Sequence, residues 1–294
     1  MGDGSVCVNI VSPHPGSRNV FLDLVVGLPA ILFLVFLAWR VKPSLRKLRR
    51  SQSHIMTTYY GFLWVVTLLN VLRCFVQVAA SEATHPVLWN LLWMLTRFGL
   101  VMLEVSVVVF LLQGYLTSGR EALLRTLWIS GGLALFETLV TLLYVFAFHV
   151  PLFLYGGGDG QEGHRGVDDD RRWSKWGFWL AHTLVFLLVY TGILILPHTK
   201  WRDRLPAKPS FYRYVLILFV LNLVAALGTI LLASHVAGGY CIYGLAAFLY
   251  YAIYPPLLYL TFLAEFFLDD ELDDELYYSE MKEAGYFEDY DDGL

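Results

Sequence analysis

The sequence predicts an all-α integral membrane protein, built as a bundle of seven helices. Three observations lead to this fold class. Hydrophobic residues make up 57% of the chain and charged residues only 16%, against about 25% charged in soluble proteins, and the mean hydropathy is +0.57. Seven apolar runs are long enough to cross a bilayer. The connections between them alternate between rich and poor in basic residues, as is typical of membrane proteins.

The seven apolar runs fill most of the chain. We expect spans at about residues 20–39, 55–80, 87–112, 123–150, 176–196, 214–233 and 241–263. Residues 20–267 would then form the transmembrane domain, with a short segment at 1–19 before it and an acidic tail at 268–294 after it. No apolar core follows a basic start in residues 1–19, so we expect the first span to act as the insertion signal.

The distribution of Lys and Arg predicts the orientation. Thirteen of them lie in the first, third and fifth connections and five on the opposite side. Because basic residues favour the cytoplasmic side, we expect the N-terminus outside the cell or in a lumen and the C-terminus in the cytoplasm. The plasma membrane and an endomembrane both fit this orientation.

The basic inner connections form a candidate surface for a cytoplasmic partner. Its residues are Arg46, Lys47, Arg49 and Arg50 in the first connection, and Arg202 and Arg204 in the fifth. Contact with anionic lipid explains the same residues, so the sequence leaves both interpretations open.

The third run, residues 87–112, contains two charged residues and is therefore expected to be surrounded by other helices. It carries Arg97 and Glu104, and each charge near mid-membrane costs about 2.5 to 3.5 kcal/mol, while about fifteen strongly apolar residues return about 0.3 to 0.6 kcal/mol each. Residues seven apart share one helix face, so both side chains must face other helices or water. We expect the two to be coupled, so that Arg97→Ala strands Glu104.

Other spans contribute polar residues that must also face inward. The full set is Asn70, Arg73, Arg97, Glu104, Glu137, His182 and Asn222. Two interpretations stay open. The charges could neutralise one another as a network that holds the helices together, or the set could line a pocket for a ligand or an ion in the outer half of the bundle.

Several kinds of chemistry do not fit the sequence. Retinal would need a Schiff-base lysine, and residues 241–263 contain none. The eight histidines show no i, i+4 pair of the kind that binds zinc. We therefore expect no catalytic residues, no metal, no cofactor and no nucleic acid, and the absence of a convincing internal repeat makes a transporter less favoured.

The chain has three cysteines, too few for a disulfide scaffold. Cys74 falls inside the second span, where a small hydrophobic role is expected. Cys7 and Cys241 fall on the outer side, where an oxidising compartment would allow a disulfide between them. The sequence leaves the geometry of that pair open.

Short motifs along the spans resemble one known family. They are Asp23 with Leu28-Pro29 and Leu32-Phe33-Leu34, Thr96-Arg97-Phe98 with Glu104-Val105-Ser106, Ile195-Leu196-Pro197, Phe211-Tyr212-Arg213-Tyr214 with Leu221-Asn222 and Leu227-Gly228, and Phe248-Leu249-Tyr250 with Pro256, Tyr259 and Phe266-Phe267. From about residue 20 to residue 267, the chain is similar to the transmembrane protein adipocyte-associated family.

The resemblance implies an orphan seven-helix membrane protein treated as a candidate G-protein-coupled receptor. The resemblance does not identify a ligand, and a heterotrimeric G protein as partner is a hypothesis by analogy with other seven-helix receptors. Likeness to the rhodopsin-like class is poor, because Leu112-Gln113-Gly114-Tyr115 ends the third span in place of an acid-Arg-Tyr triplet. The alternatives are a scaffold or trafficking adaptor that acts through the acidic tail, and a small-solute transporter.

Overall fold

The computed structural model describes residues 20–51, 54–79, 86–113, 119–150, 152, 165–198, 209–234, 236, 238–264 and 266–267. The described elements are all helical. Within them, seven helices are long and apolar enough to cross a membrane, which confirms the predicted all-α class.

The first six spans are single long helices. They are α2 (Val20–Ser51), α3 (His54–Ala79), α4 (Pro86–Gln113), α5 (Gly119–Leu142), α6 (Arg165–Ile195) and α7 (Pro209–Ala233). A π-helical turn, η1 (Leu143–Ala147), extends α5, and a 3-10 turn, η2 (Leu196–His198), ends α6.

The seventh span is broken into four consecutive helical pieces. These are α8 (Gly239–Phe248), the π-helical η4 (Leu249–Ile253), α9 (Tyr254–Leu258) and the π-helical η5 (Tyr259–Leu263). Pro255 and Pro256 lie in α9, where proline removes backbone donors. The span therefore departs from a regular α-helix at its centre, and π-helical turns often mark functional sites.

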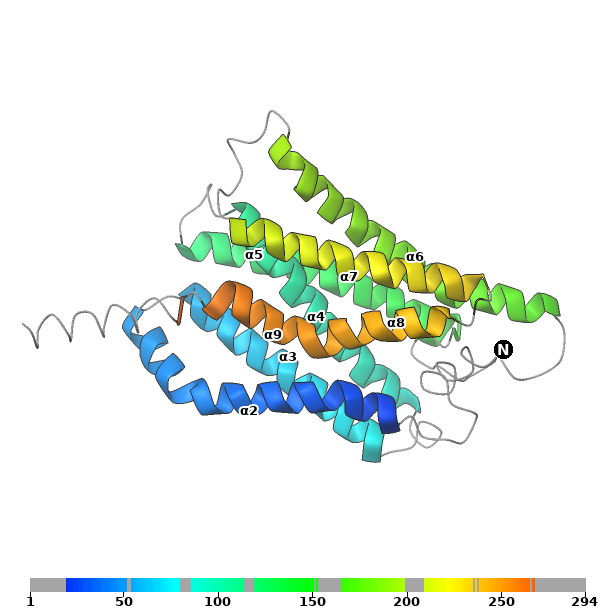
Figure 1. Cartoon of the computed structure of the whole chain (residues 1–294), viewed down its shortest axis with the longest axis horizontal. Coiled ribbons are helices and arrows are strands. Elements are labelled where there is room, and N and C mark those ends of the chain that lie inside the picture. Colours follow the sequence, from blue (N-terminus) through cyan, green and yellow to red (C-terminus); the bar gives the residue numbers. More distant parts are fainter. Residues whose placement is uncertain are drawn as a thin grey trace, which may run out of the picture.

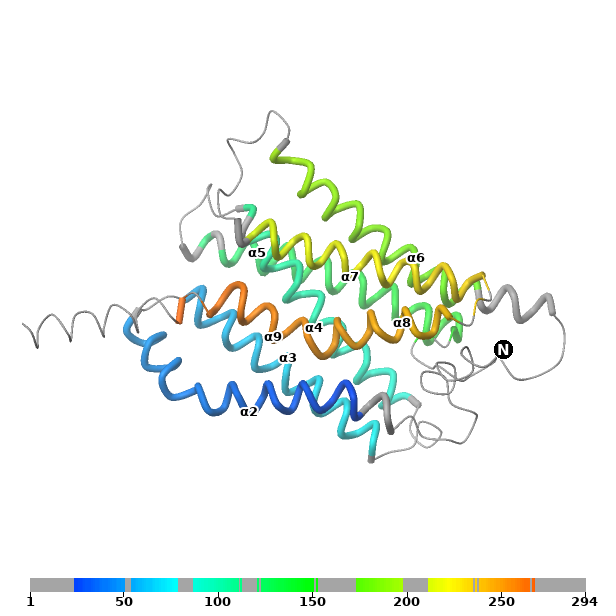
Figure 2. The backbone as a smooth tube through the Cα atoms, in the orientation of Figure 1, coloured from blue at the N-terminus to red at the C-terminus, as the bar shows by residue number. Residues whose placement is uncertain are grey.

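The helices form two groups joined by the seventh span. In one group α2 packs on α3, α3 on α4 and α4 on α5; in the other, α6 packs on α7. The seventh span lies between the groups, because α8 packs on α7 while η4 contacts α2 and α9 contacts α3 (Figure 1). The start of α2 and the last described residues, Phe266 and Phe267, lie at opposite ends of the bundle (Figure 2), as an odd number of crossings requires.

The outer surface of the bundle is apolar, as a bilayer requires. Phe75, Trp128 and Leu188 are among the largely exposed side chains. Apolar exposure on this scale is rare in soluble monomers and is expected where lipid replaces water.

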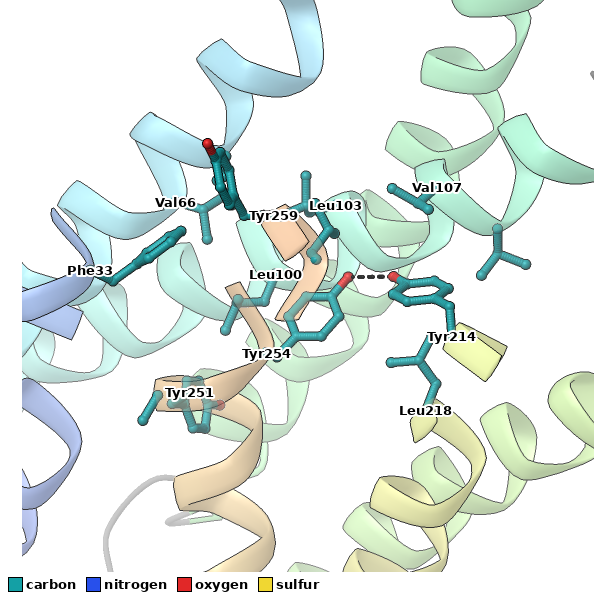
Figure 3. Packing of buried hydrophobic residues seen from close by; sticks show 14 of the residues in the cluster. Phe33, Val66, Leu100, Leu103, Val107, Tyr214, Leu218, Tyr251, Tyr254 and Tyr259 are labelled. Atoms are coloured by element: carbon teal, nitrogen blue, oxygen red, sulfur yellow. Dashed lines mark hydrogen bonds between the residues drawn. The ribbon is translucent and has the colours of Figure 1, made fainter. Parts of the chain in front are cut away.

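The interior is rich in aromatic residues and has one very close helix contact. Figure 3 shows Tyr214 of α7 and Tyr254 of α9 facing each other beside Leu100 and Leu103 of α4. A Cβ at Gly228 of α7 would lie only 2.7 Å from a backbone nitrogen of α8. Glycine therefore lets the sixth and seventh spans approach closely.

Candidate functional site

An ion cluster joins α4, α5 and α6. Arg97 Nε donates a hydrogen bond to Glu137 Oε1 at 2.9 Å, and the two side chains are 12% and 16% exposed. His182 Nδ1 lies 3.3 Å from the same oxygen, and the guanidinium carbon of Arg97 lies 4.3 Å from the centroid of the Trp179 ring. Aromatic stacking and a carboxylate thus compensate one buried positive charge.

The structure corrects the expected coupling of Arg97 to Glu104. Arg97 pairs with Glu137, whereas Glu104 accepts hydrogen bonds from the hydroxyls of Tyr190 and Tyr250. The reason is geometric. Seven residues place two side chains on one face, but they separate the two Cα atoms by about 10 Å along the helix axis at 1.5 Å per residue, and the guanidinium of Arg97 pairs instead with Glu137 of the neighbouring α5.

Glu104 is the most deeply buried acid of the set, at 2% exposure. Its two tyrosine donors come from α6 and from η4 of the seventh span, so the carboxylate ties α4 to the group formed by α6 and α7 and to the seventh span. The hydroxyls of Tyr214 of α7 and Tyr254 of α9 lie 2.9 Å apart. Tyr190 did not figure in the sequence analysis, although it lies eight residues after His182 and therefore on the same face of α6.

A second polar cluster surrounds Arg73 of α3, which is only 1% exposed. Its guanidinium lies over the rings of Trp93 and Tyr251, 4.0 and 5.0 Å from their centroids. It donates to the amide oxygens of Asn70 and Gln77 at 2.9 and 3.3 Å. Neutral acceptors and aromatic faces therefore hold this charge, in a part of the bundle where the described residues place no acid against it.

The Arg73 cluster also supports the broken seventh span. Asn70 Nδ2 donates to the carbonyl oxygen of Tyr251 at 2.7 Å, and Tyr251 lies in the π-helical η4. Irregular backbone inside a membrane needs outside hydrogen-bond partners. Asn70 and Arg73 thus fix the turn from which Tyr250 reaches Glu104.

A cavity of about 70 Å³ lies between α4, α6, α7 and α8 with η4. Arg97 and Glu104 both line it, together with His182 and Asn222. Asn222 Nδ2 donates to the carbonyl oxygen of Leu218 one turn earlier at 3.0 Å, which leaves its amide oxygen for other contacts. The cavity brings together four of the predicted residues, with a cation and a carboxylate on the same helix face.

A family model described as predicted membrane protein matches residues 15–279, which is most of the chain. The chain belongs to the Tmemb_40 family.

Relatives of this Tmemb_40 protein carry two kinds of name. It is 42% identical over 288 residues to candidate G-protein coupled receptor 2 of Arabidopsis thaliana, which covers 97% of this chain and 92% of the relative. Candidate G-protein coupled receptor 8 of the same plant is 40% identical and covers 88% of this chain and 84% of the relative. The transmembrane protein adipocyte-associated 1 homolog of Caenorhabditis elegans is 28% identical and covers 84% and 53%. No solved structure matches the chain.

These relatives confirm the predicted resemblance. The Tmemb_40 protein is thus a multi-pass membrane protein with a polar cavity inside its bundle. Among the described residues, no three His, Cys, Asp or Glu side chains form a group that could hold a metal. The cavity offers hydrogen bonds and charge to a bound molecule.

The structure describes the predicted partner surface of the Tmemb_40 protein only in part. Arg46, Arg49 and Arg50 are exposed near the end of α2, and the Lys47 ammonium lies 5.2 Å from the centroid of the Phe266 ring. Arg202 and Arg204 lie outside the described residues.

The cysteines fall into two groups. Cys241, at the start of α8, is disulfide-bonded, and Cys74 is buried with a free thiol. The predicted partner of Cys241, Cys7, lies outside the described residues.

Proposed function

We propose that the chain is a seven-helix receptor whose ligand binds in the cavity between α4, α6, α7 and α8. The N-terminus lies outside, and the basic inner connections face a cytoplasmic partner, with a heterotrimeric G protein as the first candidate. The observation that carries the proposal is the cavity itself, in which Arg97 and Glu104 share one wall. The names of the two plant relatives support the signalling part.

The size and charge of the cavity define the class of ligand. Drug-sized ligands occupy about 300 to 1,000 Å³, so a cavity of about 70 Å³ suits only a small molecule. A guanidinium has five N–H donors, and in the described part of the chain Arg97 meets Glu137 and Tyr251. Arg97 therefore keeps N–H donors that can bond to an oxygen atom of a ligand. A small carboxylate or a similar acceptor is therefore the ligand class we propose.

The position of the cavity allows a bound ligand to contact both helix groups. It lies where α6 and α7 meet α4 and the seventh span, so its walls belong to both helix groups. A ligand that contacts the two groups differently in two arrangements shifts the balance between those arrangements. Signalling of this kind needs binding and movement, and we propose that the protein is not an enzyme and uses no cofactor.

Reconstitution tests the proposal. The purified chain in nanodiscs is incubated with a heterotrimeric G protein and a panel of small carboxylates, and nucleotide exchange is measured. We expect one class of carboxylate to raise both the melting temperature and the exchange rate. Ala225→Phe places a ring in the cavity and should abolish both effects, whereas Leu227→Phe, on the exposed face of the same helix, should preserve them.

Two results would refute the receptor. The first is exchange that no member of the panel changes, and the second is a response that Ala225→Phe leaves intact. A panel compound that crosses the membrane of proteoliposomes through the chain, without stimulating exchange, would make the cavity a transport site instead.

A further inference from the structure

The last third of α2 carries a basic surface that ligand binding does not require. α2 stays helical through Pro43 and bends in this part of its length (Figure 1). Four exposed basic residues, which we call the basic stripe, follow the bend: Lys42, Arg46, Arg49 and Arg50. Spacings of four, seven and eight residues place them on one face of the helix.

The basic stripe faces away from the bundle. Ser44 and Leu48, on the other side of the helix, are buried at 3% and 4% exposure. At 1.5 Å per residue, the stripe is about 12 Å long. Basic residues in the last turn complement the helix dipole, but that effect is confined to one turn, and the stripe covers more than two.

The last described residues, Phe266 and Phe267, lie close to the part of α2 that carries the basic stripe. The Phe266 ring lies 5.2 Å from the Lys47 ammonium, and the Phe267 ring packs 5.5 Å from that of Tyr60. Phe266 therefore lies beside the last turns of α2, whatever the orientation of the bundle in the membrane.

The tail has the charge and the length to reach the stripe. Residues 268–294 contain twelve Asp and Glu and one Lys, and six of the acids fall within residues 269–275. Eight residues beyond Phe267 extend up to about 28 Å, while half the circumference of a helix 10 Å wide is about 16 Å. The acidic block can thus pass round α2 and lie along the stripe.

We propose that residues 269–275 bind the basic stripe of α2, so that the chain covers this surface with its own tail. Two features favour the tail over anionic lipid as the occupant. A segment tethered a few residues away has an effective concentration of about millimolar, and its six acids are opposite in charge to the four basic residues of the stripe. Lipid headgroups and acidic partners would have to displace it.

The test uses the full chain in nanodiscs of phosphatidylcholine, which has no net charge. The photocrosslinker p-benzoylphenylalanine replaces Leu45, which lies beside the stripe and is 44% exposed. Mass spectrometry then measures the yield of crosslinks to residues 268–294. We expect these crosslinks at 0.05 M salt and a loss of about fivefold or more at 1 M, where the screening length falls to about 3 Å.

Two tail variants with equal charge changes sharpen the test. In the proximal variant, Asn or Gln replaces the six acids of residues 269–275. In the distal variant, Asn or Gln replaces the six acids of residues 280–292. Both variants remove six negative charges and leave residues 20–267 unchanged, so they differ only in which part of the tail is neutralised. The proximal variant should lose the crosslinks, and the distal variant should keep them.

Three outcomes would overturn the proposal. Equal crosslink yields from the two variants would show that residues 269–275 are not the bound segment. Equal crosslink yields at 0.05 M and 1 M salt would show that the tail is not bound by charge. If the crosslinker captures phosphatidylserine in mixed nanodiscs while the tail is not captured in neutral ones, the stripe is a lipid-binding surface.

Discussion

The pairing of Arg97 with Glu137 makes a prediction that separates the two acids near Arg97. Arg97→Met keeps an apolar side chain of similar reach but removes the charge, so Glu137 is left buried with only His182 beside it. Removing one partner of a buried ion pair typically costs about 3 to 5 kcal/mol. Two unit charges about 4 Å apart at an effective dielectric of 20 interact by about 4 kcal/mol, which agrees with this range.

The second substitution identifies the partner. Glu137→Gln in the Arg97→Met background removes the stranded charge and should recover about 2 kcal/mol or more, since replacing both members of a buried pair is often nearly neutral. Glu104→Gln in the same background should recover little, because the partners of Glu104 are tyrosine hydroxyls.

The assay is reversible unfolding of the purified protein in mixed micelles, followed by tryptophan fluorescence. Both double-mutant cycles use the same detergent composition, and Arg97→Lys serves as a charge-preserving control. Equal rescue by Glu104→Gln and Glu137→Gln would refute the assigned pairing. A cost below about 1 kcal/mol for Arg97→Met would show that the pair is effectively solvated, as exposed pairs are.

Two further predictions concern hydrogen bonding and helix contact. Tyr250→Phe removes one of two donors to the buried Glu104 carboxylate and should cost about 1 to 3 kcal/mol of unfolding free energy. Tyr60→Phe removes a buried hydroxyl that has no hydrogen-bond partner among the described residues and should be neutral or stabilising. A larger loss of stability for Tyr60→Phe than for Tyr250→Phe would contradict the hydrogen bonding assigned to Glu104. Gly228→Ala should lower the melting temperature, because its Cβ meets the backbone of α8 at 2.7 Å, while Gly192→Ala, with nothing within 4 Å, should raise it. Equal shifts for the two alanine variants would show that the close approach of α7 to α8 is not required.

Much of the fold follows from local sequence properties. The number and length of the apolar runs predict the number of membrane crossings. Arg97 and Glu104 are expected to face the inside of the bundle because exposing a charge to lipid is costly. The structure places both beside one cavity. The sequence analysis paired Arg97 with Glu104, whereas the structure pairs it with Glu137 of α5. The relative rotation of α4 and α5 decides this partner, and the pattern of a single helix does not contain it.

The backbone of the seventh span also depends on contacts between helices, which the sequence analysis did not predict. Pro255 and Pro256 indicate a break in the helix, but two π-helical turns also depend on partners from other helices, such as Asn70. Tyr190 gains its importance only from the approach of α6 to α4. Polar contacts between spans depend on helix rotation and depth, which single-helix patterns leave undetermined.

The sequence by itself determined that this chain crosses a membrane, how often, and which side chains must be hidden from lipid, because each of these depends on the transfer free energy of one segment at a time. Only the tertiary structure decided which hidden groups meet. It separated Arg97 and Glu104 into two hydrogen-bonded sets and left a cavity between them, because contacts across helices are set by how all seven pack together.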